Sequence, residues 1–326
     1  MPTNSSARLV VHFAPCVSEG CPMPLPFNTA AWPQARATAL LSAAGCLGLL
    51  VVPVSASAAQ ADVACGGQTA SIVGTDGDDT LTGTDGVDVI VGLDGNDVIS
   101  GLDGNDVICG GGGTDTIYGE VHTPGPVLYR SGNDTIYGDG GSDVIFGDFQ
   151  NFDSESGVAA LSASDTIHGG EGADVIYGNV EEVRIVAIVT FDAGHNVIYG
   201  GEGSDVIYGD GKTGFLGAKA VMLEGGDDYI EAGAGNDTVY GDFETGNVSP
   251  GATWSSRGND DTIFGGVGSD LLYGDIAKGT ATAALDAVDG GFSDVIDGGE
   301  GASDEADGGA GSNTCIQVET ATNCNP

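Results

Sequence analysis

The chain has 326 residues, of which 40% are hydrophobic and 6% aromatic, and it contains 58 glycines. Its 48 acidic and 8 basic residues give a formal charge of −40, so it would repel nucleic-acid phosphates and anionic lipid headgroups, and cations are its natural partners. This composition argues against a thick-cored globule, and the regular spacing of Ile, Val and Leu argues against simple disorder.

Residues 1–61 are predicted to form a secretory leader, because their only acidic residue is Glu19 and they contain an apolar run followed by small residues. Cleavage would follow Ala61 or Ala58, and a start at Met23 would give a signal of more ordinary length. We therefore expect a secreted, extracellular protein, free or associated with a cell surface, and no insertion into the membrane.

Four cysteines remain after this leader: Cys65, Cys109, Cys315 and Cys324. An even number of cysteines in an exported chain indicates disulfides, although four cysteines allow three connectivities. Proximity in the sequence favours Cys65 with Cys109 and Cys315 with Cys324. Residues 62–73 are expected to cap the repeats that follow.

From Gly74 to Tyr118 the sequence reads as five uninterrupted nonapeptides: GTDGDDTLT, GTDGVDVIV, GLDGNDVIS, GLDGNDVIC and GGGGTDTIY. When each is numbered from 1 to 9, position 4 is Gly, position 6 is Asp and position 8 is Leu or Ile. The first six positions are turn residues and the last three form a short strand, with position 8 facing inward and positions 7 and 9 outward. Two facing sheets of such strands would bury a thin aliphatic core.

Stacked turns would bring an Asp from each level within roughly 4.8 Å of the next. Carboxylates in such a column repel one another unless a cation lies between them. Calcium fits best, because it takes several oxygen ligands and accepts backbone carbonyls beside carboxylates. Zinc or copper would require His or Cys, which the turns almost lack.

This pattern resembles the hemolysin-type calcium-binding repeat, GGxGxDxUx, of the repeats-in-toxin (RTX) family. The resemblance implies an all-β fold, a parallel β-roll (β-solenoid) with two nonapeptides, about 18 residues, per turn and several Ca2+ ions between successive turns. The candidate calcium ligands are aspartates at positions 3 and 6: Asp76, Asp79, Asp85, Asp88, Asp94, Asp97, Asp103, Asp106, Asp115, Asp134, Asp143, Asp165, Asp174, Asp205, Asp228, Asp237, Asp261, Asp270 and Asp294.

Residues 119–297 carry a longer period. From Asp134 onward the gaps between position-6 residues alternate between 9 and 22 to 24 residues, which places 13- to 15-residue insertions in every second turn. Because two strands complete one circuit of a β-roll, these insertions should stack along one edge. We expect the other edge, with intact turns such as GGEGSD (Gly200–Asp205), to be the strong calcium ladder, and calcium at the enlarged edge to be weaker or patchy.

The insertions differ from one another. Residues 179–191 read as an added strand, and the other insertions share no chemical signature. An outward aromatic residue precedes each insertion at position 9, and this column is read either as stacked rings that stabilise the sheet, which we favour, or as a platform for carbohydrate. The column consists of Tyr118, Phe146, Tyr177, Tyr208, Tyr240 and Tyr273.

The sequence argues against an enzyme. The repeats begin within about a dozen residues of the leader, and neither HExxH nor GxSxG occurs. His122, His168 and His195 do not recur beside a nucleophile. The favoured prediction is a non-catalytic structural or surface-binding protein that folds on binding calcium, with residues 298–326 forming a degenerate last repeat and a cap. The alternative is an adhesin, or a module that binds carbohydrate or the cell envelope through the enlarged edge and the tyrosines.

Overall fold

The chain divides into two units, residues 1–60 and 61–326. The computed structural model describes residues 63–325 except 121–128, 155–159, 162, 186–189, 217–220, 249–253, 258, 275–277, 282–292, 302 and 310–311. The predicted leader lies outside the described residues. The described part consists of strands and turns, and it offers no helix suited to crossing a membrane.

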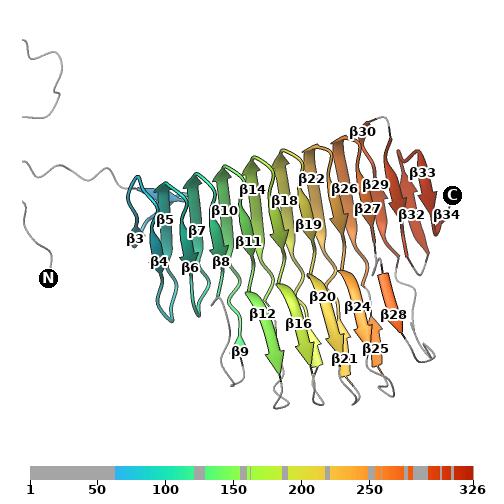
Figure 1. Ribbon diagram of the computed structural model, residues 1–326, viewed down its shortest axis with the longest axis horizontal. Coiled ribbons are helices and arrows are strands. Elements are labelled where there is room, and N and C mark those ends of the chain that lie inside the picture. Colours follow the sequence, from blue (N-terminus) through green and yellow to red (C-terminus); the bar gives the residue numbers. More distant parts are fainter. Residues whose placement is uncertain are drawn as a thin grey trace, which may run out of the picture. The chain divides into compact units, whose positions relative to one another are not determined.

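Two parallel sheets form the body of the second unit (Figure 1). The first roll sheet has twelve strands: β3 (Ile72–Val73), β5 (Val89–Asp94), β7 (Val107–Gly112), β10 (Thr135–Gly140), β14 (Thr166–Glu171), β18 (Val197–Glu202), β22 (Tyr229–Gly235), β26 (Thr262–Gly268), β29 (Val295–Asp297), β30 (Glu300–Gly301), β32 (Asn313–Ile316) and β34 (Cys324–Asn325). The second roll sheet has ten: β4 (Thr80–Thr82), β6 (Val98–Ser100), β8 (Thr116–Tyr118), β11 (Val144–Phe146), β15 (Val175–Tyr177), β19 (Val206–Tyr208), β23 (Thr238–Tyr240), β27 (Leu271–Tyr273), β31 (Glu305–Asp307) and β33 (Thr320–Thr322). The chain alternates between them, which confirms the predicted β-roll.

Position 8 forms the core, as the repeat predicts. Ile90, Ile108 and Ile136 align in the first roll sheet and Ile99, Ile117 in the second, and the exposed fraction of each side chain is 0%. One aliphatic residue per strand therefore stacks on its equivalent in the next coil. Each such burial contributes about 1.5–3 kcal/mol, so the sum over the stack replaces the thick core that the composition excludes.

The insertions are strands rather than loops. They build two further parallel sheets, which Figure 1 shows below the roll. The first arm sheet contains β12 (Phe149–Ser154), β16 (Val180–Ile185), β20 (Gly211–Leu216), β24 (Phe243–Val248) and β28 (Lys278–Ala281). The second arm sheet contains β9 (Tyr129–Arg130), β13 (Ala160–Leu161), β17 (Thr190–Asp192), β21 (Val221–Glu224) and β25 (Trp254–Arg257).

The sequence predicted a strand in only one insertion, residues 179–191, which holds β16 and β17. The other insertions lack a clear alternating pattern, yet each pairs in parallel with its neighbours. Their strands arise because insertions of similar length in successive coils offer backbone partners to one another, which no single insertion reveals. The predicted stacking of insertions along one edge is confirmed.

A disulfide closes each end of the described chain, with the predicted connectivity. At the first end, β1 (Ala64–Cys65) and β2 (Gln68–Thr69) form a hairpin, and Cys65 bonds to Cys109 on β7. Cys65 is 2% exposed and packs with Val89, Val91 and Val107, so the hairpin covers the outer face of the first strands.

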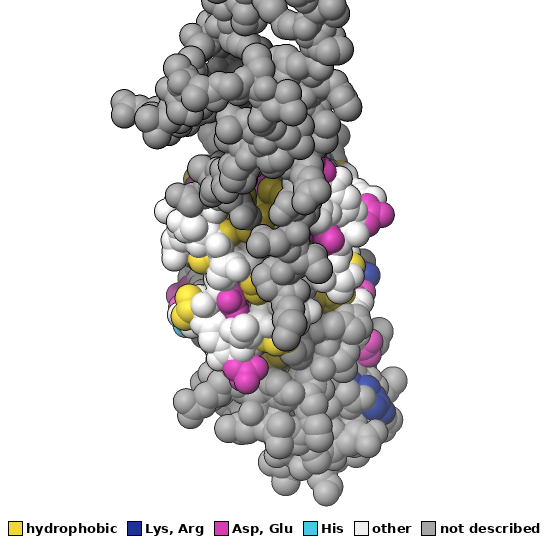
Figure 2. Space-filling model, turned by 90° about the vertical axis from the view of Figure 1, so that its left-hand side faces the viewer, with side chains coloured by type: hydrophobic (Ala, Val, Ile, Leu, Met, Phe, Trp, Pro, Cys, Tyr) yellow, Lys and Arg dark blue, Asp and Glu magenta, His cyan; other side chains and the backbone are white. Residues whose placement is uncertain are grey.

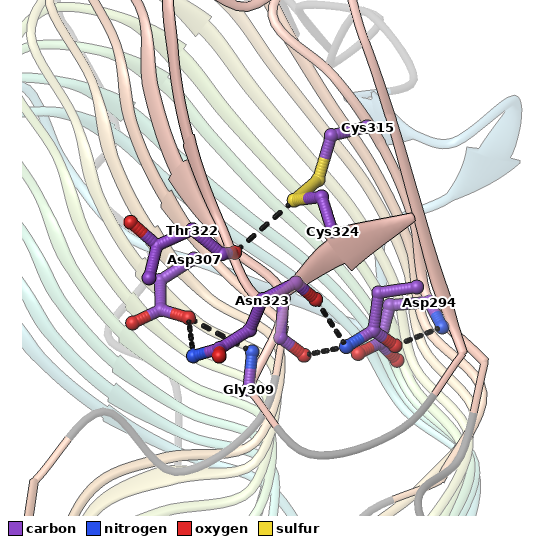
Figure 3. Close-up of a disulfide and its surroundings, with 9 residues drawn as sticks. Asp294, Asp307, Gly309, Cys315, Thr322, Asn323 and Cys324 are labelled. Carbon is purple, nitrogen blue, oxygen red and sulfur yellow. Dashed lines mark hydrogen bonds between the residues drawn. A yellow bond between two sulfur atoms is a disulfide. The ribbon is translucent and has the colours of Figure 1, made fainter. Parts of the chain in front are cut away.

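At the other end, Cys315 aligns with Ile296 at the core position and bonds to Cys324 on the last strand (Figure 3). Asn323 follows the last strand of the second roll sheet, and its amide donates to Oδ1 of Asp307 at 2.7 Å. Both roll sheets thus continue through residues 298–325, the segment read from the sequence as a degenerate repeat and cap.

Candidate calcium sites

The position-6 residues form two side-chain ladders along the edges of the roll. At the short edge, the backbone N–H of Asp97 donates to Oδ1 of Asp115 in the next coil, and that of Asp115 donates to Oδ1 of Asp143, both at 2.8 Å. The same bond recurs from Asp79 to Asp304 along this edge and from Asp88 to Asn313 along the enlarged edge. One carboxylate oxygen of each Asp is therefore used by the backbone.

The second oxygen of these carboxylates is buried and has no hydrogen-bond partner. This holds for Oδ2 of Asp97, Asp106, Asp115, Asp134, Asp143, Asp165, Asp174, Asp205, Asp228, Asp237, Asp261, Asp270 and Asp304. The side chains are at most 2% exposed. A buried carboxylate oxygen without a partner is costly, so this repeated feature requires a proton or a cation.

The orphan oxygens face a second acceptor across the position-1 glycine. A Cβ placed on Gly265 would lie 2.7 Å from Oδ2 of Asp270 and 2.8 Å from the carbonyl oxygen of Gly298 in the next coil. A side chain at position 1 would fill this space, which explains the glycine. Two oxygen acceptors thus approach the same point, and Oδ2 of Asp270 has no hydrogen-bond donor there.

The two asparagines at position 6 show what a donor does there. Nδ2 of Asn196 donates to the carbonyl oxygen of Gly209, the position-1 residue of the next coil, at 2.9 Å, while Oδ1 still accepts from the backbone N–H of Asp165 at 3.0 Å. Asn313 likewise donates from Nδ2, to the carbonyl of Gly308. An amide therefore satisfies the site from within, whereas an aspartate leaves two acceptors facing each other.

Burial raises the pKa of Asp143, Asp205 and Asp237 at the short edge. Burial raises the pKa of Asp205 to about 6. Burial, together with the neighbouring carboxylates Asp174 and Asp115, raises the pKa of Asp143 to about 7, although a hydrogen bond from the Asp115 backbone lowers it. The pKa of Asp237 is raised to about 7, again chiefly by burial. A cation between the oxygens would remove this penalty.

The first two turns are built differently. Oδ2 of Asp79 accepts from the backbone N–H of Thr75 at 2.6 Å and from its hydroxyl at 2.8 Å, and Thr84 makes the same pair of bonds to Asp88. Threonine at position 2 thus satisfies the carboxylate, so these two turns have no orphan oxygen. In the third and fourth turns and at the short edge beyond them, position 2 adopts a positive φ, with Leu102 at 74° and Gly201 at 114°, and the bond is lost.

The candidate ligands at position 3 lie elsewhere. Asp76, Asp85, Asp94 and Asp103 are exposed, and the structure does not bring them to the position-6 ladder. Figure 2, which faces the β3 end of the array, shows acidic side chains at this surface. They remain predicted ligands without a buried, unsatisfied oxygen.

Position 5 carries a third ladder, which the sequence analysis missed. Oδ1 of Asp78 accepts from the backbone N–H of Asn96, whose own Oδ1 accepts from Thr114, at 2.9 and 2.8 Å. The ladder explains His195, because its Nδ1 accepts from the backbone N–H of Asp227 at 2.8 Å. The recurring Asn, Asp and Ser at position 5 were the signal, since all can accept from a neighbouring coil.

The short-edge ladder also runs further than predicted. The N–H of Asp270 donates to Oδ1 of Asp304, and the N–H of Asp304 donates to Oε2 of Glu319 at 2.7 Å. A one-residue insertion before Asp304 disguised its position 6. Asn313 ends the enlarged-edge ladder, and its nonapeptide, GGAGSNTCI, was visible in the sequence.

The aromatic column is stacked and buried, which agrees with the structural reading favoured from the sequence. Its six rings stack with centroids 4.9 to 5.1 Å apart and planes within 6°. Tyr118, Phe146, Tyr177, Tyr208 and Tyr240 are 2–7% exposed, and the Tyr208 hydroxyl reaches Glu244 on β24 at 3.5 Å. His168 stacks between Tyr137 and Tyr199 in a second, half-buried column on the first roll sheet, at 4.8 Å from each ring. His122 lies outside the described residues.

The donor set fits calcium. Across the described ranges, His, Cys, Asp and Glu side chains nowhere gather in threes around a point that could hold a metal. Each site instead offers one buried carboxylate oxygen and backbone carbonyls, an all-oxygen set that suits calcium better than zinc or copper, which prefer His or Cys. When bound, the ion would supply the positive charge that these facing acceptors lack.

A comparison with protein families agrees with this geometry. The family model described as RTX calcium-binding nonapeptide repeat (4 copies) matches repeatedly, at residues 66–99, 82–117, 130–151, 160–180, 192–211, 223–244 and 257–276. The chain belongs to the RTX calcium-binding nonapeptide repeat family. A search of curated proteins gave no significant match. The RTX matches coincide with roll strands and their turns and leave most of the arm strands uncovered, so the arms are additions to the family's repeat.

Proposed function

We propose that this protein is a secreted, non-catalytic structural protein whose RTX roll folds when it binds calcium. The observation that carries the proposal is the column of orphan Oδ2 atoms at position 6, each facing a backbone carbonyl. Without a cation these carboxylates must either ionise inside the fold or hold protons, and both disfavour the roll at neutral pH.

The site residues act in two ways in this proposal. Oδ1 of each position-6 Asp fixes the register of neighbouring coils by accepting a backbone N–H. Oδ2, with the position-1 carbonyl of the next coil, provides the oxygens for the ion. Register and cation binding thus share one side chain, so filling a site orders two coils at once.

Far-ultraviolet circular dichroism of the full chain, dialysed into chelator and titrated with calcium and then with magnesium, tests the proposal. We expect a coil-to-strand transition with calcium, reversed by chelator and not reproduced by magnesium, because magnesium dehydrates reluctantly and demands octahedral geometry. A strand-rich spectrum that ignores chelator contradicts the proposal.

Export is supported by the two disulfides, which persist in oxidising compartments. Alkylating free thiols in protein recovered from the medium and from the cells tests it. In protein from the medium, disulfide formation should protect Cys65, Cys109, Cys315 and Cys324 from alkylation. Export would be contradicted if all of the protein stayed in the cell with these cysteines reduced.

The adhesin alternative receives no support from the tyrosines. The rings of both aromatic columns stack face to face on one another, so the faces that would contact a sugar ring are already occupied. We therefore assign no carbohydrate-binding role to either column.

A further inference from the structure

An acid opens most of the enlarged turns, directly after the position-1 glycine. These position-2 residues are Glu120, Asp148, Asp210 and Asp242, with Asn179 in one coil, and they are 0–2% exposed. They lie between the roll and the arm, where β8, β11, β19 and β23 end. The RTX repeat pattern has no acid at this position, so these carboxyl groups are additional to the position-6 ladder.

Each position-2 acid lies near the position-6 Asp that closes the same enlarged turn. The backbone N–H of Gly226, two residues before Asp228, donates to Oδ2 of Asp210 at 3.3 Å. That of Gly132, two residues before Asp134, donates to Oε1 of Glu120. The pairs stack into two groups. The first acidic cluster is Glu120, Asp134, Asp148 and Asp165, and the second acidic cluster is Asp210, Asp228, Asp242 and Asp261.

In the second acidic cluster, carboxylate oxygens from two coils approach one glycine. A Cβ on Gly225 would lie 2.9 Å from Oδ2 of Asp210 and still closer to Oδ1 of Asp242. Oδ2 of Asp228 and of Asp261 are buried orphan atoms. Asp210 and Asp242, from neighbouring coils, therefore approach a backbone position at which any side chain would clash with their oxygens.

The coil between the two clusters is the informative exception, because both members of its pair are amides. Nδ2 of Asn196 donates to Oδ1 of Asn179 at 3.1 Å, and Nδ2 of Asn179 donates to Oδ2 of Asp148 at 3.1 Å. The position equivalent to Gly225 is Ala193, which is 3% exposed. This pair of amides therefore satisfies itself without a cation.

We propose that the two acidic clusters bind calcium ions of their own, separate from those of the short edge, and so tie the arms to the roll. Pairs of carboxylates from positions 2 and 6, with backbone carbonyls such as that of Gly241, provide the oxygens. The inference rests on the proposed calcium binding of the roll. It implies that calcium binding along the enlarged edge, expected from the sequence to be weak or patchy, is interrupted at the single coil that carries Asn179 and Asn196.

Counting bound calcium by equilibrium dialysis of the full chain at saturating calcium tests this. The loss variant is Asp210→Asn with Asp228→Asn, which copies the amide pair that the fold already contains. The gain variant is Asn179→Asp, Ala193→Gly and Asn196→Asp, which copies the second acidic cluster. The matched control is Glu182→Gln with Glu305→Gln, two exposed acids with the same charge change.

We expect the loss variant to bind at least one ion fewer than the wild type, the gain variant at least one more, and the control the same number. The inference is overturned if either variant keeps the wild-type number with its strand content intact, because the pairs would then share protons rather than cations. If the wild type binds no calcium, the proposed function fails as well, and the two failures are thereby distinguished.

Discussion

Replacing Asp143 with Asn should make the calcium-free roll more stable. Asp143 is 1% exposed, and its pKa is raised to about 7 from 3.8, chiefly by burial. When a group has a higher pKa in the folded than in the unfolded state, its stabilising effect is complete at pH values below the unfolded-state pKa. This stability is lost as the pH rises through the folded-state pKa. At pH 7 the penalty is about 4 kcal/mol, and at pH 4 it falls to about 0.6 kcal/mol.

The amide should keep the architecture of the turn. Asn196 shows that an Asn at position 6 accepts the backbone N–H of the preceding coil and donates to the position-1 carbonyl of the next. In the variant, Oδ1 would accept from Asp115 and Nδ2 would face the carbonyl of Gly169. The expected gain in chelator at pH 7 therefore approaches the full penalty of about 4 kcal/mol.

Urea unfolding in chelator, followed by circular dichroism, measures the gain, with sucrose added equally to all samples to populate the roll. The control is Asp85→Asn, an exposed position-3 acid with the same charge change. In calcium, the variant should lose the contribution of one site, about 2.7 kcal/mol at a hundredfold excess over Kd. The reasoning is refuted if Asp143→Asn lowers stability in chelator at pH 7, or if Asp85→Asn raises it equally.

Three further predictions concern the rest of the fold. In chelator, lowering the pH from 7 to about 5 should increase strand content, because Asp106, Asp143, Asp205 and Asp237 have pKa values raised to about 6 or 7 and the folded state then binds more protons than the unfolded chain; a flat circular dichroism signal would contradict this. Removing the Cys65–Cys109 disulfide, which closes a loop of 44 residues, should lower the free energy of unfolding in calcium by about 4 kcal/mol. Removing Cys315–Cys324, which closes a loop of 9 residues, should lower it by about 2.6 kcal/mol. Serine variants compared by urea unfolding should show this order. Leu102→Gly should raise stability by about 1 kcal/mol because Leu102 has a φ of 74°, whereas the same change at Leu272, a core residue with 0% exposure, should lower it.

The roll was predictable because its determinants are local and repeated. Position 8 alone identifies the core, and the period of the aspartates identifies the stacking, so Ile108 and Asp115 could be placed from one nonapeptide. The disulfides followed from sequence proximity. What the sequence could not reveal is how each Asp divides its two oxygens, because that depends on the backbone of the coils before and after it.

The arms escaped prediction for a related reason. The strand β20 (GKTGFL) and the strand β24 (FETGNV) have little strand character of their own, and they form because each finds a partner one coil away. The acids that open the enlarged turns were visible as recurrent Gly-Asp pairs, but their approach to position 6 requires the insertion to fold back on itself. Sequence distance concealed that Asp210 accepts a hydrogen bond from Gly226, two residues before Asp228.

The arrangement of acids and amides gives the fold a graded demand for cations. The first two turns satisfy their carboxylates with Thr75 and Thr84, and the last enlarged-edge turn does so with Asn313. Between these, nearly every position-6 residue leaves an oxygen without a partner. The ends, which a disulfide also closes, therefore have fewer unsatisfied carboxylates than the central coils. Since coils contact only their neighbours, calcium would decide whether order spreads inward from the two capped ends.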